Sequence, residues 1–252
     1  MSQADDWVVR PERFVRYLRE TKGLSASDVR LPSRGVIVFG GEDFRTLCKA
    51  LHARVLRWNE WYGIGRRGKT HIVVIRTPIG APATVLNFEE AIALGLRRTV
   101  AFGSCGSLLR DLPIGSVVLP SRAYADEGTS RHYGGERWSR PDSILAKRLR
   151  DACGRRGVPV REGGTWTTDA PYRESRRKVR YLAGRGVVAV DMEASALFQV
   201  ARVRGVRVAS LFVVSDELDG PEWNQGFRDP RHLAAKRRAA GAVLEALGGL
   251  QS

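Results

Sequence analysis

Short apolar runs rich in β-branched residues alternate along this chain with segments of helical character. GVIVFG, from Gly35 to Gly40, and VASLFVVSD, from Val208 to Asp216, are two of the expected strands, and a helix is expected from about Ala194 to Arg204. The runs are continuously apolar, which is typical of strands buried on both faces. We therefore expect one α/β domain with a mostly parallel or mixed sheet between layers of helices.

The other expected elements continue this alternation. Helices are expected at 43–56, 87–96, 144–153 and 230–247, and strands at 71–78, 99–103, 116–121 and 187–192. Residues 1–34 read as an N-terminal helical extension, because Phe14, Val15 and Leu18 form an apolar stripe and turn and capping residues follow. Residues 35–249 are expected to form a single domain.

The chain is strongly basic, with a formal charge of +15 over 252 residues. Such a surplus raises nucleic-acid binding as a hypothesis. The basic residues are scattered, however, and the densest stretch, Arg173–Arg185, spaces its arginines three and four apart, as on a solvated helix face. We therefore expect no nucleic-acid partner. The excess positive charge is expected at most to steer an anionic co-substrate towards the protein.

The cysteines and the hydropathy of the chain indicate where the protein is located and whether it holds disulfides or zinc. Cys48, Cys105 and Cys153 are far apart and odd in number, which gives neither a disulfide framework nor a zinc spacing. No apolar run approaches the ~20 residues needed to span a bilayer. The first residues lack the apolar stretch of a signal peptide. We expect a cytoplasmic protein with no membrane partner, no metal and no organic cofactor.

Small and polar residues follow several of the expected strands, where α/β folds bind their ligands. In GGEDFR, from Gly40 to Arg45, glycines and an arginine one helical turn later form either an anion site or an ordinary turn. RTPIGAPAT (Arg76–Thr84) is either a second such segment or a tight connection. GSCGSL (Gly103–Leu108) is expected as a glycine-rich turn that cradles phosphate or sugar, or packs where only glycine fits.

Carboxylates end two further apolar runs, in DMEAS (Asp191–Ser195) and SDEL (Ser215–Leu218). A carboxylate there pays a desolvation penalty unless it pairs or accepts hydrogen bonds. Helix capping competes well as an explanation for Asp191 and Ser215. For Glu193 and Asp216 together we favour function, since a glutamate can accept hydrogen bonds from two ribose hydroxyls and an aspartate can protonate a leaving base.

Four motifs together point to a family. In this order and spacing, GSCGSL, TTDAPY, DMEASALF and SDEL resemble the nucleoside phosphorylase family of purine nucleoside and uridine phosphorylases, whose fold is shared by 5′-methylthioadenosine/S-adenosylhomocysteine nucleosidases. The resemblance extends from about Gly35 to Gly249. It implies a mixed, twisted central sheet flanked by helices. It also implies a homo-oligomer, a hexamer or a dimer, whose sites are completed by a neighbouring subunit.

The resemblance implies a phosphate site and a nucleoside site. Phosphate would contact Gly41 and Arg45, which match a Gly-Asp-Pro-x-Arg loop, and Ser104. Arg57 would be donated by the neighbouring subunit. The nucleoside residues it implies are Met192 and Glu193 on the ribose, Asp216 at the purine N7, Tyr172 near the base, Arg228 beside the aspartate, and Cys105 and Gly106 of the glycine turn.

One position departs from the family pattern. Phosphorylases carry an arginine two residues before the glycine turn, and this chain has Ala101 there. A bidentate arginine is hard to replace for phosphate, although Arg76 or Arg122 at other strand ends are possible substitutes. The hydrolytic nucleosidases also lack that arginine, because water is their nucleophile. The segment from Asp126 to Tyr133 either faces the sugar with His132 or is a surface turn.

The expected reaction is phosphorolysis of a purine nucleoside to free base and pentose 1-phosphate. Glu193 and Met192 would fix the ribose, and Asp216 would have to carry a proton for the departing base. The alternative on the same fold is a phosphate-independent hydrolase of adenine-type nucleosides. A nucleoside-binding protein without catalysis is a further hypothesis.

Overall fold

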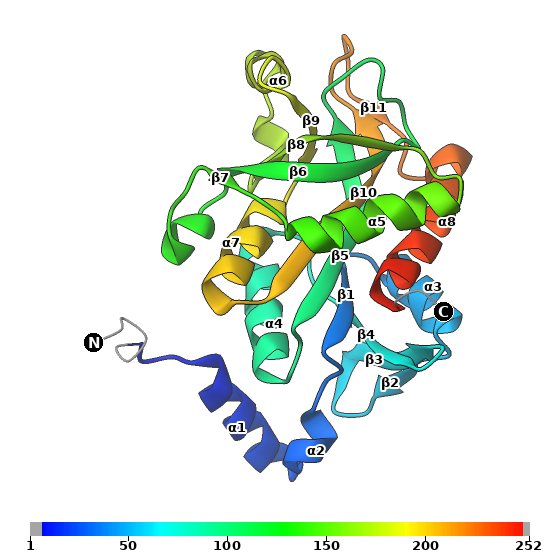
Figure 1. Ribbon diagram of the computed structural model, residues 1–252. Coiled ribbons are helices and arrows are strands. Elements are labelled where there is room, and N and C mark those ends of the chain that lie inside the picture. The colour runs from blue at the N-terminus through cyan, green and yellow to red at the C-terminus, as the bar shows by residue number, and fades with distance from the viewer. Residues whose placement is uncertain (1–6, 249–252) are drawn as a thin grey trace.

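Figure 1 shows the computed structural model, which describes residues 7–248. Within this part of the chain, eleven strands join in one sheet. The strands are β1 (Arg34–Val38), β2 (Arg54–Leu56), β3 (Asn59–Arg67), β4 (Thr70–Arg76), β5 (Arg98–Ser107), β6 (Val117–Asp126), β7 (Trp138–Ser139), β8 (Val160–Thr168), β9 (Val187–Asp191), β10 (Arg207–Glu217) and β11 (Asn224–Gln225). The helices are α1 (Pro11–Lys22), α2 (Ala26–Val29), α3 (Gly41–Ala50), α4 (Ala81–Ala93), α5 (Ser143–Arg155), α6 (Arg176–Ala183), α7 (Ala194–Arg204) and α8 (Pro230–Gly248).

The central strands are buried on both faces, as their continuous apolar runs predict. Along β1, Val36 and Val38 belong to one hydrophobic cluster and Ile37 to another. The first cluster includes residues of α3, α5 and α8, and the second includes residues of α4 and α7. Figure 1 shows these two groups of helices on opposite sides of the sheet. The prediction of a single α/β layer structure is confirmed.

The sheet is mixed and partly closes on itself. β5 pairs parallel with β1 and β10, whereas β10 and β6 are antiparallel. The pairings β6–β8, β8–β9 and β9–β5 return to the starting strand, so that β5, β10, β6, β8 and β9 form a circuit. β1, β4, β3 and β2 extend the sheet from β5, in the lower part of Figure 1. This curvature brings strand ends from distant parts of the chain together.

The expected helix at 43–56 is wrong at its C-terminal end. α3 ends at Ala50, His52 takes a left-handed backbone conformation with φ of 48°, and Arg54–Leu56 forms β2. β2 pairs with β3, a strand that the sequence does not predict. The pairing and the burial of Leu56 outweigh the helical propensity of this segment.

The expected glycine turn at 103–108 is also wrong, because β5 runs without a break to Ser107. Its second half is paired on both sides, with Gly106 opposite Val190 of β9 and Asp216 of β10. A Cβ atom at Gly106 would lie 2.5 Å from Leu218 and 3.1 Å from Asp216 Oδ2. The glycines are therefore required by close packing, one of the two explanations that the sequence leaves open.

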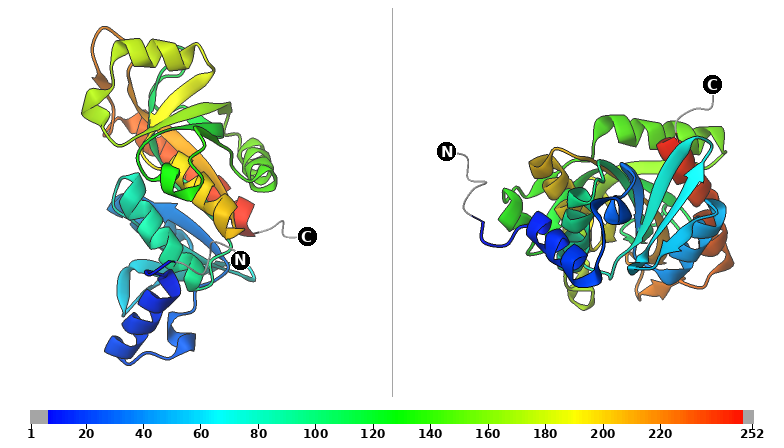
Figure 2. Two further views of the ribbon diagram at one scale, coloured as in Figure 1. Left: turned by 90° about the vertical axis from the view of Figure 1, so that its left-hand side faces the viewer. Right: turned by 90° about the horizontal axis from the view of Figure 1, so that it is seen from below.

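The N-terminal helices α1 and α2 lie at the bottom of Figure 1, and Figure 2 shows α1 beside the β2–β4 end of the sheet. Lys22 donates to the Trp58 carbonyl at 2.7 Å, and the Trp58 indole donates to the Asp28 carbonyl at 3.0 Å. The division into an extension at 1–34 and a domain at 35–249 stays a prediction, and residues 1–6 and 249 of those ranges lie outside the described residues. In the described part of the chain, no helix has the length and apolar character to cross a membrane.

Candidate functional site

A cavity of about 690 Å³ opens where β1, β5, β9 and β10 end or are paired. Residues of all four strands, or of the segments directly after them, line it. The segments 171–176 and 220–227 form further walls. Seven of the predicted site residues line this cavity together: Ser104, Cys105, Gly106, Tyr172, Met192, Glu193 and Asp216.

Glu193 lies on the cavity wall directly after β9 and is 5% exposed. Its Oε1 accepts a hydrogen bond from the Gly80 N–H at 2.7 Å. Gly80 has a φ of 107°, a conformation that favours glycine, so the RTPIGAPAT segment provides this donor. Burial, and next the charge of Asp191, raise the pKa of Glu193 to about 8. Its carboxyl group is therefore available to a ligand with hydroxyl groups and holds a proton near neutral pH in the empty site.

Asp191 holds the backbone at Glu193 through hydrogen bonds. It is buried and accepts hydrogen bonds from the backbone N–H groups of Glu193 and Ala194, both at 2.7 Å. Thr165 and Thr167 donate to it from β8. Asp191 thus satisfies the first turn of α7, the capping function that competes with catalysis in the sequence, and fixes the backbone before Glu193.

Asp216 forms the second carboxylate wall, on β10, and is 9% exposed. The Ser215 hydroxyl donates to Oδ1 at 2.6 Å and the Trp223 indole donates to Oδ2 at 2.8 Å. The sequence does not single out Trp223, which contacts Phe227 in a T-shaped arrangement at 6.2 Å. Both rings line the cavity, where they offer apolar faces to a planar ligand.

Glu174 is a further carboxyl group on the cavity, and the sequence does not predict it. Burial, and next the charge of Asp216, raise the pKa of Glu174 to about 7. Nearby, Tyr172 is 92% exposed at the rim of the cavity. This end of the cavity therefore combines two neighbouring carboxyl groups with the two aromatic rings of Trp223 and Phe227, and we name it the base end.

Another part of the cavity lies where β1 leads into α3. The α3 N-terminus has no side-chain cap, so its first N–H groups stay available. A Cβ atom built on Gly41 would lie 3.3 Å from an Arg45 guanidinium nitrogen and 3.7 Å from one of Arg76. Two predicted arginines thus meet beside Gly41, although none of the three is on the cavity wall itself. Arg122, the other suggested substitute, lies elsewhere, with its guanidinium 4.2 Å from the centroid of the Trp138 ring.

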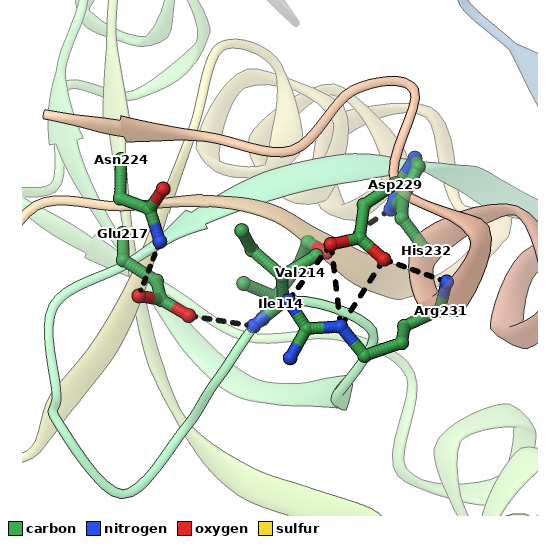
Figure 3. A network of polar contacts seen from close by, with 7 residues as sticks. All are labelled: Ile114, Val214, Glu217, Asn224, Asp229, Arg231 and His232. Carbon is green, nitrogen blue, oxygen red and sulfur yellow. Dashed lines mark hydrogen bonds and ion pairs between the residues drawn. The ribbon is translucent and has the colours of Figure 1, made fainter.

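Ser104 also faces this end and contacts a histidine. Its Oγ lies 3.4 Å from His232 Nε2, and His232 Nδ1 lies 3.0 Å from the Val214 carbonyl oxygen. Because the carbonyl only accepts, we place the proton on Nδ1, which leaves Nε2 as an acceptor. Burial lowers the pKa of His232. Figure 3 shows the ring beside Val214, a contact that joins α8 to β10. It also shows Arg231 donating to Asp229 at the start of α8.

Lys236, one turn after His232 on α8, contributes an ammonium group that the sequence does not single out. Its Nζ lies 2.5 Å from Asp43 Oδ2, and both side chains are 14% exposed. Lys236 and Asp43 both line the cavity beside Ser104. We name the region of Gly41, Arg45, Ser104, Asp43 and Lys236 the anion end. The sequence feature that could have identified Lys236 is its position on the buried face of α8, four residues after His232.

Four predicted residues do not line the cavity: Gly41 and Arg45, which lie beside its wall, and Arg57 and Arg228. The 126–133 segment does not line it either. Arg57 lies near Trp58 and Trp61, at a separate hollow against α1. Arg228 is exposed, and Trp223 is the residue that donates to Asp216. In the 126–133 segment, His132 is exposed and Glu127 accepts from its own turn and from Ser195, so this segment is a surface turn. Roles for Arg57 and Arg228 remain predictions.

No group of three or more His, Cys, Asp or Glu residues within 7–248 is arranged to hold a metal ion. Cys105 lines the cavity, but burial, and next Asp216 and Asp191, raise the pKa of its thiol well above the ordinary value. A thiol in that state is a poor nucleophile.

Comparisons with known proteins agree with these motifs. The model of a family described as the phosphorylase superfamily matches residues 34–247. A DeoD-type purine nucleoside phosphorylase of Bacillus cereus is 32% identical over 155 residues, which are 60% of this chain and 66% of that protein. The corresponding protein of Myxococcus xanthus (strain DK1622) is 33% identical over 157 residues, 61% of this chain and 64% of its own. The aligned region thus spans just under two thirds of each relative.

Solved structures show the same fold. Purine nucleoside phosphorylase from Toxoplasma gondii, in complex with immucillin-H, has a TM-score of 0.78 at 21% identity and covers 89% of this chain and 93% of its own. Uridine phosphorylase from Vibrio fischeri ES114 has a TM-score of 0.77 at 22% identity, with coverages of 87% and 93%. Because the family model matches most of this chain, the chain belongs to the phosphorylase superfamily, the family of nucleoside phosphorylases that the motifs of the sequence resemble.

Proposed function

We propose that the protein cleaves the N-glycosidic bond of a purine nucleoside with inorganic phosphate, giving free base and pentose 1-phosphate. The observation that carries this proposal is one cavity that is lined by Glu193 and Met192, by Asp216 and Glu174, and by Ser104 and Lys236. Such an arrangement suits a sugar bound between a departing base and an attacking anion.

Each wall has a part in the reaction. When the nucleoside binds, Glu193 releases its proton to solvent, and its carboxylate accepts hydrogen bonds from the ribose hydroxyl groups while the Gly80 N–H holds Oε1. Asp216 delivers a proton to the purine as the bond to the sugar breaks, and Glu174, whose pKa is about 7, is the nearby store of that proton. Trp223 and Phe227 contact the planar base. Phosphate, bound at the anion end, attacks the anomeric carbon as positive charge develops on the sugar.

The proposal is tested by assaying a panel of purine and pyrimidine nucleosides, each with and without phosphate, and following base release. Purine nucleosides are expected to react only when phosphate is present, and pyrimidine nucleosides to react much more slowly. Purine release at an unchanged rate in phosphate-free buffer would contradict phosphorolysis. Uridine as the preferred substrate would contradict purine specificity.

Hydrolysis of an adenine-type nucleoside is the second candidate, and a specific observation favours it. The position of the family arginine is Ala101, which is fully buried, and the cavity instead contains the Asp43 carboxylate. A carboxylate repels phosphate and can act as a base towards water. Under this alternative, Asp43→Asn abolishes phosphate-independent base release. Under phosphorolysis, the same variant remains active.

A further inference from the structure

Lys236 is an unusual residue for the place it occupies. It belongs to the inner side of α8, where Ala235, Ala239 and Ala240 are buried, whereas the neighbouring Arg237 and Arg238 are exposed. Transferring an ammonium group out of water is costly unless a partner compensates it. Asp43 is that partner, 2.5 Å away. A buried pair at a cavity wall calls for an explanation beyond stability, because apolar residues of similar size often stabilise a fold as well.

The location of Lys236 supplies that explanation. It lines the main cavity and also a smaller one of about 210 Å³, and the two share Gly40, Asp43, Ser104 and Phe227. Its ammonium group therefore lies at the junction, beside Ser104 and the uncapped start of α3. The ring of Phe102 lies beneath it, with its centroid 5.5 Å from Nζ.

Ala101 cannot be the source of this charge, and the strand register explains why. Ala101 pairs with Ile37 of β1 on one side and Ser210 of β10 on the other, in the middle of the sheet. It belongs to the apolar cluster that α4 and α7 cover, so this face of β5 carries no cation at this level. α8 packs on the other face, where Val243 and Leu247 belong to the same cluster as Val36 and Val38. A cation can reach the cavity from that helix.

We propose that Lys236 binds the phosphate co-substrate and replaces the arginine that is absent at Ala101, with Asp43 as the residue that positions it. This inference rests on the proposed phosphorolysis. A lysine binds phosphate as a point charge and does not need the planar geometry of a guanidinium group. Because Asp43 offsets part of its charge, Arg45 and the N–H groups at the start of α3 share the binding of a dianion.

The test compares Lys236→Met with wild type. Methionine keeps an apolar stem over Phe102 and removes only the charge. The KM for phosphate is expected to rise about 10- to 100-fold, as for the loss of a hydrogen bond to a charged group. The KM for the nucleoside is expected to stay within about twofold. Lys236→Arg should recover much of the phosphate affinity. Lys49→Met, at an exposed lysine on α3, is the matched control and should match wild type in both constants.

Asp43→Asn separates phosphate binding from a structural role. The carboxamide oxygen still accepts a hydrogen bond from Lys236, while the negative charge is gone, so phosphate should bind as well as in wild type or better. If the pair were only structural, both variants would lose thermal stability and neither would change the KM for phosphate selectively. That result would overturn the inference.

Calorimetry of inorganic phosphate binding, in the absence of nucleoside, distinguishes the role of Lys236 from the proposed phosphorolysis. Phosphate should bind wild type and bind Lys236→Met at least about tenfold more weakly. Equal binding to both proteins, with phosphate-dependent activity in wild type, would overturn the role of Lys236 alone. Activity of wild type that is independent of phosphate would overturn the proposed function itself.

Discussion

The base end and the anion end of the cavity differ in what holds their charged groups. At the base end, the Asp216 carboxylate is held by neutral donors from its own stretch of chain, Ser215 and Trp223, one and seven residues away. At the anion end, the Lys236 ammonium group is held by the charged Asp43, 193 residues away in sequence. The donors that hold Asp216 therefore come from its own stretch of chain, whereas only the packing of α8 against the sheet brings Lys236 to Asp43.

The difference also separates the kinetic roles that we expect. Groups at the base end act on the departing purine, so their loss should lower kcat. Groups at the anion end bind the co-substrate, so their loss should raise the KM for phosphate. Glu193 lies between them and should affect both. The four substitutions below test this division, from the largest expected effect to the smallest.

Asp216→Asn should have the largest effect. The carboxamide has one oxygen, so it accepts from only one of Ser215 and Trp223, and it delivers no proton. The kcat for a purine nucleoside is therefore expected to fall about 10²- to 10⁴-fold, with little change in either KM. Initial rates of base release measure this. Asp219→Asn, at a residue paired with Arg110 outside the cavity, is the control. Full activity of Asp216→Asn would remove the aspartate from the mechanism.

Glu193→Gln should lower activity and raise stability at the same time. Loss of the charged acceptor for the ribose is expected to lower kcat/KM about 100-fold. The folded protein binds the Glu193 proton more tightly than the unfolded chain, since the pKa rises from 4.5 to about 8. Wild type therefore loses stability as the pH rises from 4.5 through 8, by at most about 1.4 kcal/mol for each pH unit.

The carboxamide of Glu193→Gln does not titrate, so the Tm of this variant should exceed that of wild type by a margin that grows up to about pH 8 and is then constant. Thermal unfolding from pH 5 to 9 measures the margin. A margin independent of pH would show that Glu193 is ionised throughout this range, contrary to the effect of its burial.

Arg45→Ala should act on phosphate alone. Its guanidinium group lies beside Gly41 at the start of α3, so the KM for phosphate is expected to rise about tenfold while the nucleoside KM is unchanged. Arg54→Ala, at an exposed residue of β2, is the matched control. If Arg45→Ala mainly lowered kcat, the separation between the two ends would fail.

Glu174→Gln should have the smallest effect and change the pH profile. With a pKa of about 7, Glu174 is protonated below that pH, and kcat of wild type is expected to fall as the pH rises through 7. The variant should lack this limb and be at most about tenfold slower at pH 6. Glu222→Gln, at an exposed residue on the cavity rim, should keep the wild-type profile. If kcat of Glu174→Gln still fell as the pH rose through 7, another group would be responsible for the fall.

The fold class could be predicted because burial on both faces leaves a direct trace in the sequence, as Val36, Ile37 and Val38 show. β2 and β3 could not, since their pairing depends on β4 and not on local propensity. DMEAS and SDEL predicted Glu193 and Asp216, which the fold brings into one cavity. Trp223, Glu174 and Lys236 carry no motif, and their proximity to the site arises from the tertiary fold.

The most direct test of the account is the identity of the sugar product. Phosphorus NMR of a reaction that contains enzyme, a purine nucleoside and phosphate should show a new phosphate-ester signal of pentose 1-phosphate that grows in step with the free base. Release of base with free pentose and an unchanged phosphate signal would contradict the account, and would assign the cavity to hydrolysis.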